Sequence, residues 1–207
     1  MHTKPGRRPD DVELNDELVH SQFDAHAETF RASNNLLVPL IAETGEVITD
    51  RLAAGGKLIA FGNGGSAAQA DHLVGELIGR YRKTRAPLPA ISLGSSQGTV
   101  TCIANDFSFD SIFERQVEAL GRKGDVVIGL TTSGSSKNVL RGLQAGREAG
   151  AVTIMLTGGG ITDAPSDYIV SVPSTSTARI QEVHLVIIHA WCELVDGRWS
   201  VVDGRWS

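Results

Sequence analysis

The sequence has few cysteines, no long apolar segment and no excess of basic residues. Its 207 residues include only Cys102 and Cys192, too few for the disulfide framework of a small secreted domain. Both stand among apolar residues, which predicts two buried free thiols and is consistent with a reducing cytoplasm. No run approaches the roughly 18 apolar residues of a transmembrane helix. The first residues also lack the apolar core of a signal peptide.

The charge balance narrows the choice of partners. A net charge of −5 offers no general basic field for nucleic acid. We therefore predict a cytoplasmic protein with neither a membrane nor a nucleic acid as partner. A hydrophobic content of 41% and a charged content of 21% are ordinary for a globular protein that buries a substantial core.

This length fits a single domain with short tails. We predict a disordered polar tail over residues 1–10, one domain over residues 11–196 and a second tail over residues 197–207. The motif VDGRWS ends at Ser200 and recurs at once, ending at Ser207. Six residues are too few for a solenoid unit, so the repeat indicates a local duplication or a cloning artefact. A tryptophan-bearing tail that packs on a neighbour is the alternative.

Two successive helical patterns precede the first strand. Apolar residues recur at loose helical spacing over residues 11–33 and again over residues 34–54, where the pattern ends near Gly55. These patterns predict a two-helix N-terminal arm whose apolar face needs cover. Packing against a second subunit is one way to provide it.

Residues 57–81, KLIAFGNGGSAAQADHLVGELIGRY, carry the first chemical signal. A strand pattern runs into a glycine turn, and a helical pattern follows. Gly64 and Gly65 allow close backbone approach to a ligand, and Ser66 can cap the helix. The free N–H groups of a helix start favour an anion. Glycine turns of this kind also occur in α/β folds without a ligand, and neither a Walker loop nor a dinucleotide fingerprint is present.

The helix after this turn carries His72 and Glu76, which are four residues apart and so share one face. Such a pair is a candidate for acid–base chemistry or for metal binding. It is also common on solvated helix faces, so the spacing alone does not decide.

A second turn repeats the same design. An apolar strand pattern over residues 125–130 ends in Thr131-Thr132-Ser133-Gly134-Ser135-Ser136, and a helical pattern follows over residues 137–149. Hydroxyls and N–H groups at a helix start form a neutral cradle for phosphate, although serine and threonine are favoured as caps in any case. Two such turns at strand ends favour a phosphate-type ligand, since open α/β sheets bind ligands there.

The remaining patterns complete an alternating α/β chain. Strands are predicted over residues 90–93, 100–104, 152–157 and 168–172, and helices over residues 109–120 and 178–195. His189 falls in the apolar middle of the last helix. A lone histidine there is more often a hydrogen-bonded core residue than a catalyst, and the pattern leaves both roles open.

Four stretches together resemble the sugar isomerase (SIS) domain superfamily, and within it the phosphoheptose isomerases. They are GNGGSAAQADHLVGELIGRY, CIANDFSFDSIF, TTSGSSKNV and ARIQEVHLVIIHAWCELV, within residues 57–196. The resemblance implies a doubly wound five-stranded parallel sheet flanked by helices, with a helical N-terminal arm. It also implies a homotetramer with sites between subunits.

The resemblance further implies an aldose–ketose isomerase that converts sedoheptulose 7-phosphate to D-glycero-D-manno-heptose 7-phosphate, with Glu76 as base and His189 as acid. The implied substrate contacts are Asn63, Gly64, Gly65, Ser66, Asp106, Thr131, Thr132, Ser133, Ser136 and Gln181. One zinc ion per subunit is implied on His72, Glu76, Gln181 and His189.

The zinc set contains a geometric conflict. Gln181 and His189 are eight residues apart, which is about 12 Å of helix rise. One ion can join them through extended side chains, through a Gln181 that precedes the regular helix, or through two subunits.

Three alternatives to this function stand beside it. Ala178 occupies a position where some relatives carry an acid, and the segment over residues 158–167 is short, so another sugar phosphate can be the substrate. A non-catalytic regulator that binds a replication initiator shares the same motifs, but it needs neither Glu76 nor His189. A sugar-phosphate sensor usually carries a DNA-binding module, and no such pattern is evident here.

Overall fold

The computed structural model describes residues 9–199, 201–202 and 205–206, and its centre is a parallel sheet. The strands are β1 (Leu58–Gly62), β2 (Ala90–Ser92), β3 (Val126–Leu130), β4 (Val152–Gly158) and β5 (Tyr168–Val172). They are ordered β2-β1-β3-β4-β5, and every neighbouring pair is parallel. The prediction of a five-stranded parallel sheet is confirmed.

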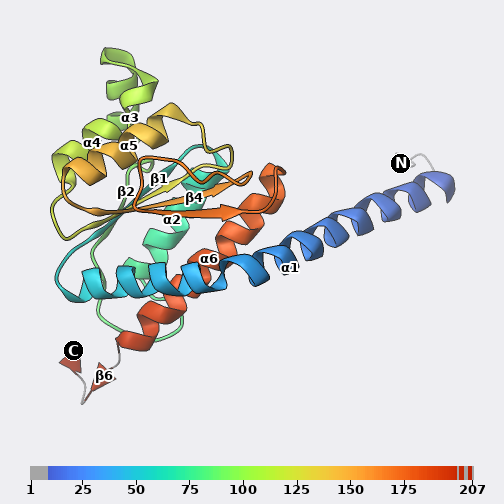
Figure 1. The fold of residues 1–207 in the computed structure, drawn as a ribbon, viewed down its shortest axis with the longest axis horizontal. Coiled ribbons are helices and arrows are strands. Elements are labelled where there is room, and N and C mark those ends of the chain that lie inside the picture. The colour runs from blue at the N-terminus through green and yellow to red at the C-terminus, as the bar shows by residue number, and fades with distance from the viewer. Residues whose placement is uncertain (1–8, 200, 203–204, 207) are drawn as a thin grey trace, which may run out of the picture.

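Helices cover both faces of the sheet (Figure 1). One face carries α1 (Pro9–Ala53), α2 (Gly65–Ile78) and α6 (Thr177–Arg198), and the other carries α3 (Gln97–Asp106), α4 (Glu114–Leu120) and α5 (Lys137–Glu148). The strands are almost wholly buried. Their side chains contribute to two separate apolar cores, with Leu58 and Ile128 in one and Phe61 and Val127 in the other. No helix in the described part of the chain combines the length and the apolar composition needed to cross a bilayer.

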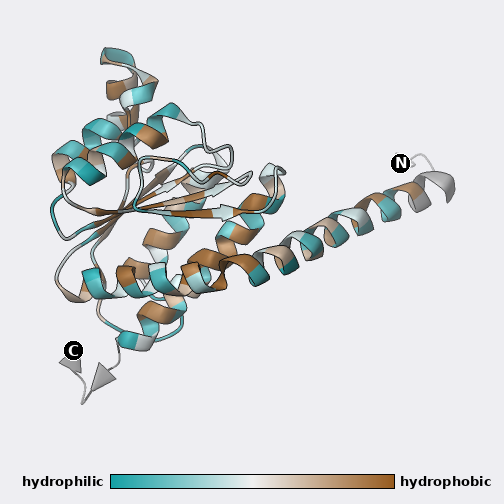
Figure 2. Cartoon of the chain, in the orientation of Figure 1, coloured by the Kyte–Doolittle hydropathy of each residue, from teal (hydrophilic) through white to brown (hydrophobic). Residues whose placement is uncertain are grey.

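The N-terminal arm is one helix, so the prediction of two helices is wrong. Pro39 lies inside α1, where it removes one backbone hydrogen bond. Packing keeps the helix continuous, because Leu37 and Ile48 are buried and the Trp191 indole of α6 donates to the Ile41 carbonyl at 3.2 Å. Figure 2 shows apolar residues gathered where α1 crosses α6.

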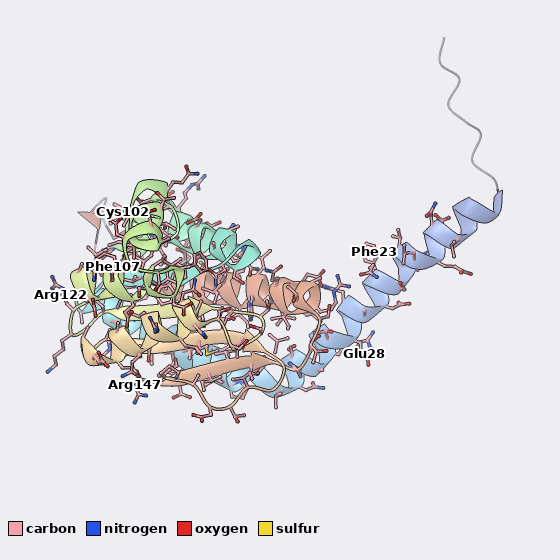
Figure 3. All side chains as sticks on the ribbon, turned by 90° about the horizontal axis from the view of Figure 1, so that it is seen from above. Phe23, Glu28, Cys102, Phe107, Arg122 and Arg147 are labelled. Carbon is pink, nitrogen blue, oxygen red and sulfur yellow. The ribbon has the colours of Figure 1, made fainter. Side chains whose placement is uncertain are left out.

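The first half of α1 projects from the body as an arm (Figures 1 and 3). Its apolar side chains Leu14, Leu18 and Phe23 are 66%, 62% and 70% exposed. Figure 3 shows Phe23 on the part of α1 that extends beyond the body. The single chain therefore leaves the apolar side chains of this arm exposed to solvent, and nothing within the described part of the chain covers them.

Three local predictions are corrected. The apolar stretch over residues 100–104 is part of α3 rather than a strand, and Cys102 on that helix is exposed rather than buried. The helix predicted over residues 109–120 divides into a 3-10 turn, Phe109–Ser111, and α4. The strand prediction failed because periodicity alone does not distinguish a short apolar run in a helix from one in a strand.

The predicted tails fall partly outside the described residues, and the first two residues of the C-terminal one, Gly197 and Arg198, belong to α6 rather than to a tail. Residues 1–8, 200, 203–204 and 207 are not described, while residues 9 and 10 already belong to α1 rather than to a tail. In the C-terminal stretch, β6 (Val201–Val202) pairs antiparallel with β7 (Arg205–Trp206).

A buried histidine makes stability depend on pH. His184 of α6 is fully buried, its Nε2 lies 3.1 Å from the Thr157 carbonyl oxygen, and its Nδ1 has no partner. Burial lowers the pKa of His184 to about 4. In the unfolded chain this imidazole is protonated below about pH 6.5, whereas in the folded chain it is protonated only below about pH 4.

We expect the free energy of unfolding to fall by about 3 kcal/mol from this group between pH 7 and pH 4. Urea unfolding at a series of pH values measures it. His184→Gln keeps an N–H donor but does not titrate, so its stability should depend less on pH over this range. An unchanged slope in that variant would assign the pH dependence to other groups.

Candidate functional site

Two loops meet at the carboxyl edge of the sheet. The strands β1 and β3 are neighbours, with Gly62 paired to Leu130, so the turns that follow them lie side by side. Both helices that follow these turns begin here. A pocket forms between them, lined by Asn63, Gly64, Gly65, Ser66, Leu130, Thr131, Thr132, Ser133, Ser136, Thr177 and Gln181. All the predicted substrate contacts except Asp106 are brought together in it.

The hydroxyls of the second loop face one another rather than capping α5. Ser136 is the N-cap residue, yet its side chain makes no capping hydrogen bond. Its Oγ lies 3.1 Å from Thr131 Oγ1, which is 3.4 Å from Ser133 Oγ. The first N–H groups of α5 are therefore not capped by the Ser136 side chain, and this end of the helix suits an anion.

The glycine turn brings α6 into the pocket. Gly64 has a positive φ of 54°, and a Cβ on Gly65 would lie 2.6 Å from Gln181 Nε2. Only glycine at position 65 leaves room for that amide. Gln69 of α2 also donates to the backbone oxygen of Gln181 at 2.6 Å. The prediction that Ser66 caps α2 is wrong, because the helix begins at Gly65 and Ser66 lies buried in its first turn.

An ionisable cluster lies further along the same two helices. His72 Nε2 is 3.1 Å from His189 Nε2 and 3.4 Å from Glu76 Oε1. The Tyr81 ring stacks on His189 with ring centroids 5.5 Å apart. His72 and Glu76 are 40% and 23% exposed, and His189 is half-buried. His189 therefore packs beside His72 and Tyr81, while His72 and Glu76 stay on a face that solvent reaches, so the spacing and the exposure leave both readings of that pair open.

Gln181 is separated from this cluster within one chain. It lies inside α6, which begins at Thr177, so the option that Gln181 precedes the regular helix is wrong. Its amide is aimed at Gly65, and eight residues of helix, about 12 Å, lie between it and His189. Among the residues that the structure describes, no three His, Cys, Asp or Glu side chains already surround a common metal position.

Asp106 is not brought to the pocket. It ends α3, is exposed, and accepts hydrogen bonds from Asn105 and Cys102 on its own helix. The same carboxylate raises the pKa of the Cys102 thiol. A role for Asp106 in this chain's own site would require a movement of α3 or a second subunit.

Sequence reasoning missed a buried ion pair behind Glu76. Arg85 Nε donates to Asp196 Oδ1 at 2.9 Å, with both side chains 1% exposed, and Arg85 Nη2 donates to the Glu76 carbonyl oxygen at 2.8 Å. The pair thus ties the end of α2 to α6. Asp196 stands where the predicted last helix runs into the repeated VDGRWS motif. No spacing in the sequence indicates that its partner is Arg85.

The charges around Asp196 decide its ionisation. Burial alone would favour the neutral acid, but N–H donors from Lys83, Arg82 and Arg85 outweigh it and lower the pKa of Asp196. The neighbouring thiol behaves differently, because burial, with Glu76 and Asp196 nearby, raises the pKa of Cys192 to about 12. Cys192 is therefore a neutral packing residue, as predicted.

A family model described as "SIS domain" matches residues 23–158. The chain belongs to the SIS domain family. This SIS domain is 47% identical over 182 residues to the phosphoheptose isomerase of Aquifex aeolicus, and 48% identical over 182 residues to that of Paramagnetospirillum magneticum; each alignment covers 87% of this chain and 95% of the relative.

Solved structures agree with the sequence relatives. The SIS domain superposes on a phosphoheptose isomerase from Neisseria gonorrhoeae with a TM-score of 0.81 at 36% identity, covering 88% of this chain and 98% of that one. For the enzyme from Francisella tularensis the TM-score is 0.83 at 33% identity, with coverage of 87% and 97%. The predicted resemblance to the SIS superfamily and its phosphoheptose isomerases is confirmed.

Proposed function

We propose that this SIS domain is an aldose–ketose isomerase that converts sedoheptulose 7-phosphate to D-glycero-D-manno-heptose 7-phosphate. The observation that carries the proposal is a hydroxyl-lined pocket at the starts of α2 and α5 together with a His–Glu–His cluster on α2 and α6. The pocket suits a phosphate and the cluster suits proton transfer. Relatives that share nearly half of their residues with this chain are named phosphoheptose isomerases.

The proposed chemistry moves one proton between two carbons. The Glu76 carboxylate takes the proton from C1 of the ketose while His189 protonates the C2 oxygen, which gives an enediol. Glu76 then returns its proton to C2, and His189 accepts the proton of the C1 hydroxyl to leave the aldehyde. His72 contacts both groups and holds them in register. Acid–base catalysis of this kind requires side chains within hydrogen-bonding reach of the reacting atoms.

The phosphate pocket supplies orientation in this scheme. Thr131, Ser133 and Ser136 present hydroxyls and α5 presents its N–H groups to the distant phosphate, with Gln181 at the opposite wall. Binding energy from the non-reacting phosphate then places C1 and C2 against the base and acid.

We further propose that the working site is assembled between subunits of a homotetramer. The projecting arm of α1 exposes Leu14, Leu18 and Phe23. An apolar groove between α1 and α6, lined in part by Val38, Val186 and Leu194, is also open. Association would cover both surfaces, and we propose that Asp106 and Gln181 contact the cluster of a neighbouring subunit.

Zinc fits part of the cluster. Two imidazole nitrogens and a carboxylate oxygen are ligands that zinc takes, and a tetrahedral site with bonds of about 2.0–2.1 Å separates its ligands by about 3.3 Å. The two separations at His72 agree with this spacing, but in the described residues the three side chains do not yet surround one metal position, so Glu76 or His189 would have to turn on binding. We propose that His72, Glu76 and His189 hold one zinc ion per subunit, with Gln181 reaching it from another subunit. A bound zinc ion would polarise the substrate oxygens.

The cytoplasm remains the proposed location of this enzyme. Cys102 and Cys192 are both free thiols in the structure, and exposed thiols persist in a reducing compartment.

Incubation with sedoheptulose 7-phosphate tests the function. We expect NMR to show a heptose 7-phosphate forming until the two sugars reach equilibrium, with pentose and hexose phosphates turned over far more slowly. Preference for a shorter sugar phosphate would support the isomerase activity but change the proposed substrate, an alternative that Ala178 leaves open. The absence of turnover for every sugar, with and without added zinc, would favour a non-catalytic binding protein.

A further inference from the structure

Helix α5 carries a buried amide that the proposed chemistry does not use. Asn138 is the second residue of the helix and is 2% exposed. The other buried residues of α5 are apolar or glycine: Val139, Gly142, Leu143, Ala145 and Gly146. Buried amides are costly unless they are hydrogen-bonded, so the partners of Asn138 indicate its role.

The side-chain partner of Asn138 lies on the other wall of the pocket. Asn63 Nδ2 donates to Asn138 Oδ1 at 2.9 Å, and Asn138 Nδ2 donates to Asn63 Oδ1 at 2.8 Å. Asn138 Oδ1 also accepts from the Val139 N–H at 2.9 Å. The two amides therefore pair in both directions, and the pair joins the glycine turn after β1 to the start of α5.

We propose that Asn138 is a positioning residue for phosphate binding, which it achieves by fixing Asn63 and the glycine turn against the start of α5. The inference rests on the proposed function. Asn63 lines the pocket, whereas Asn138 does not, so Asn138 acts through its partner. The N–H groups of α2 and of α5 approach the ligand from separate loops, and the amide pair sets their separation before the ligand arrives. Such pre-organisation lowers the ordering cost of binding.

A merely structural role makes a different prediction. If the pair only stabilises the fold, its loss lowers the melting temperature and leaves the affinity of the folded protein unchanged. If the pair positions the pocket, the affinity for phosphate groups falls even at temperatures where the variant is fully folded.

Calorimetric titration of Asn138→Ala at a temperature well below its Tm separates the two roles. We expect the Kd for sedoheptulose 7-phosphate to rise about tenfold and the Kd for inorganic phosphate to rise with it. Gln144→Ala is the matched control, because Gln144 is an exposed amide on the same helix that bonds only Glu148. Its Kd values should equal those of the wild type.

Each result decides the question. A lowered Tm with unchanged Kd values overturns the inference. Asn138→Ser, which keeps a small polar group but cannot span to Asn63, replaces the alanine variant if that variant does not fold. If the wild type binds inorganic phosphate but does not isomerise the sugar phosphate, the proposed function fails while the phosphate Kd still decides the inference. If the wild type binds neither ligand, both fail.

Discussion

Replacing Glu76 with glutamine is expected to lower kcat for sedoheptulose 7-phosphate by about 10²–10⁴-fold, the usual contribution of a positioned general base. Glutamine keeps the size and the hydrogen-bonding oxygen of the side chain but cannot accept the C1 proton. Because the phosphate pocket is built from other residues, the affinity for substrate should change only a few-fold. The loss therefore falls on the chemical step.

Two measurements separate the base from other roles of Glu76. The first is the initial rate at saturating substrate. The second is the exchange of the C1 hydrogen of the ketose for solvent deuterium, which requires proton abstraction but not completed turnover. Both should fall together in Glu76→Gln. Exchange that continues at the wild-type rate would remove Glu76 as the base while leaving the isomerase proposal intact.

Glu118→Gln is a suitable control for this substitution. Glu118 is exposed on α4, on the opposite face of the sheet from α2 (Figure 1). The same chemical change there should leave both rate and exchange as in the wild type. Zinc content measured on each variant would show whether any loss at Glu76 follows loss of metal.

The layout of the sheet and of the hydroxyl-lined pocket was predictable because each depends on local patterns. Short apolar runs ending in glycine or hydroxyl-rich turns define β1, β3 and the helices after them. Parallel strands then bring both turns to one edge. His72 and Glu76 were predictable as a pair because four residues make one helical turn.

What the sequence left open depends on contacts between distant segments. Asn138 pairs with Asn63 across 75 positions, and Arg85 meets Asp196 across 111 positions. No short-range pattern records either pair. The continuity of α1 through Pro39 is similarly decided by tertiary packing against α6, which offsets the local cost of proline. Asp196 was especially difficult to interpret, because it is the last residue of the predicted domain and already belongs to the repeated motif that continues into the predicted tail.

That residue carries the largest expected effect on stability. Asp196→Ala should lower the free energy of unfolding by about 3–5 kcal/mol, since it leaves the Arg85 guanidinium buried without a counter-charge. The substitution also removes the acceptor for the N–H groups of Arg82 and Lys83, each 2.9 Å from Asp196 Oδ2. Urea unfolding at pH 7 measures the difference.

An exposed ion pair provides the comparison. Asp50 lies 3.5 Å from Arg198, and the two side chains are 69% and 59% exposed, so Asp50→Ala should cost less than about 1 kcal/mol. A similar small cost for Asp196→Ala would mean that water reaches Arg85 and that the pair contributes little.

The double variant Arg85→Met with Asp196→Leu isolates the cause. It removes both charges and keeps apolar volume, so it should recover much of the stability that Asp196→Ala loses. The pH dependence has a definite sign as well. Because the folded-state pKa of Asp196 is lowered, its contribution is complete above the unfolded-state pKa and is lost as the pH falls through the folded-state value. The double variant should lack that acid-side loss, and it should also release the Glu76 carbonyl from Arg85, so stability can recover while isomerase activity does not.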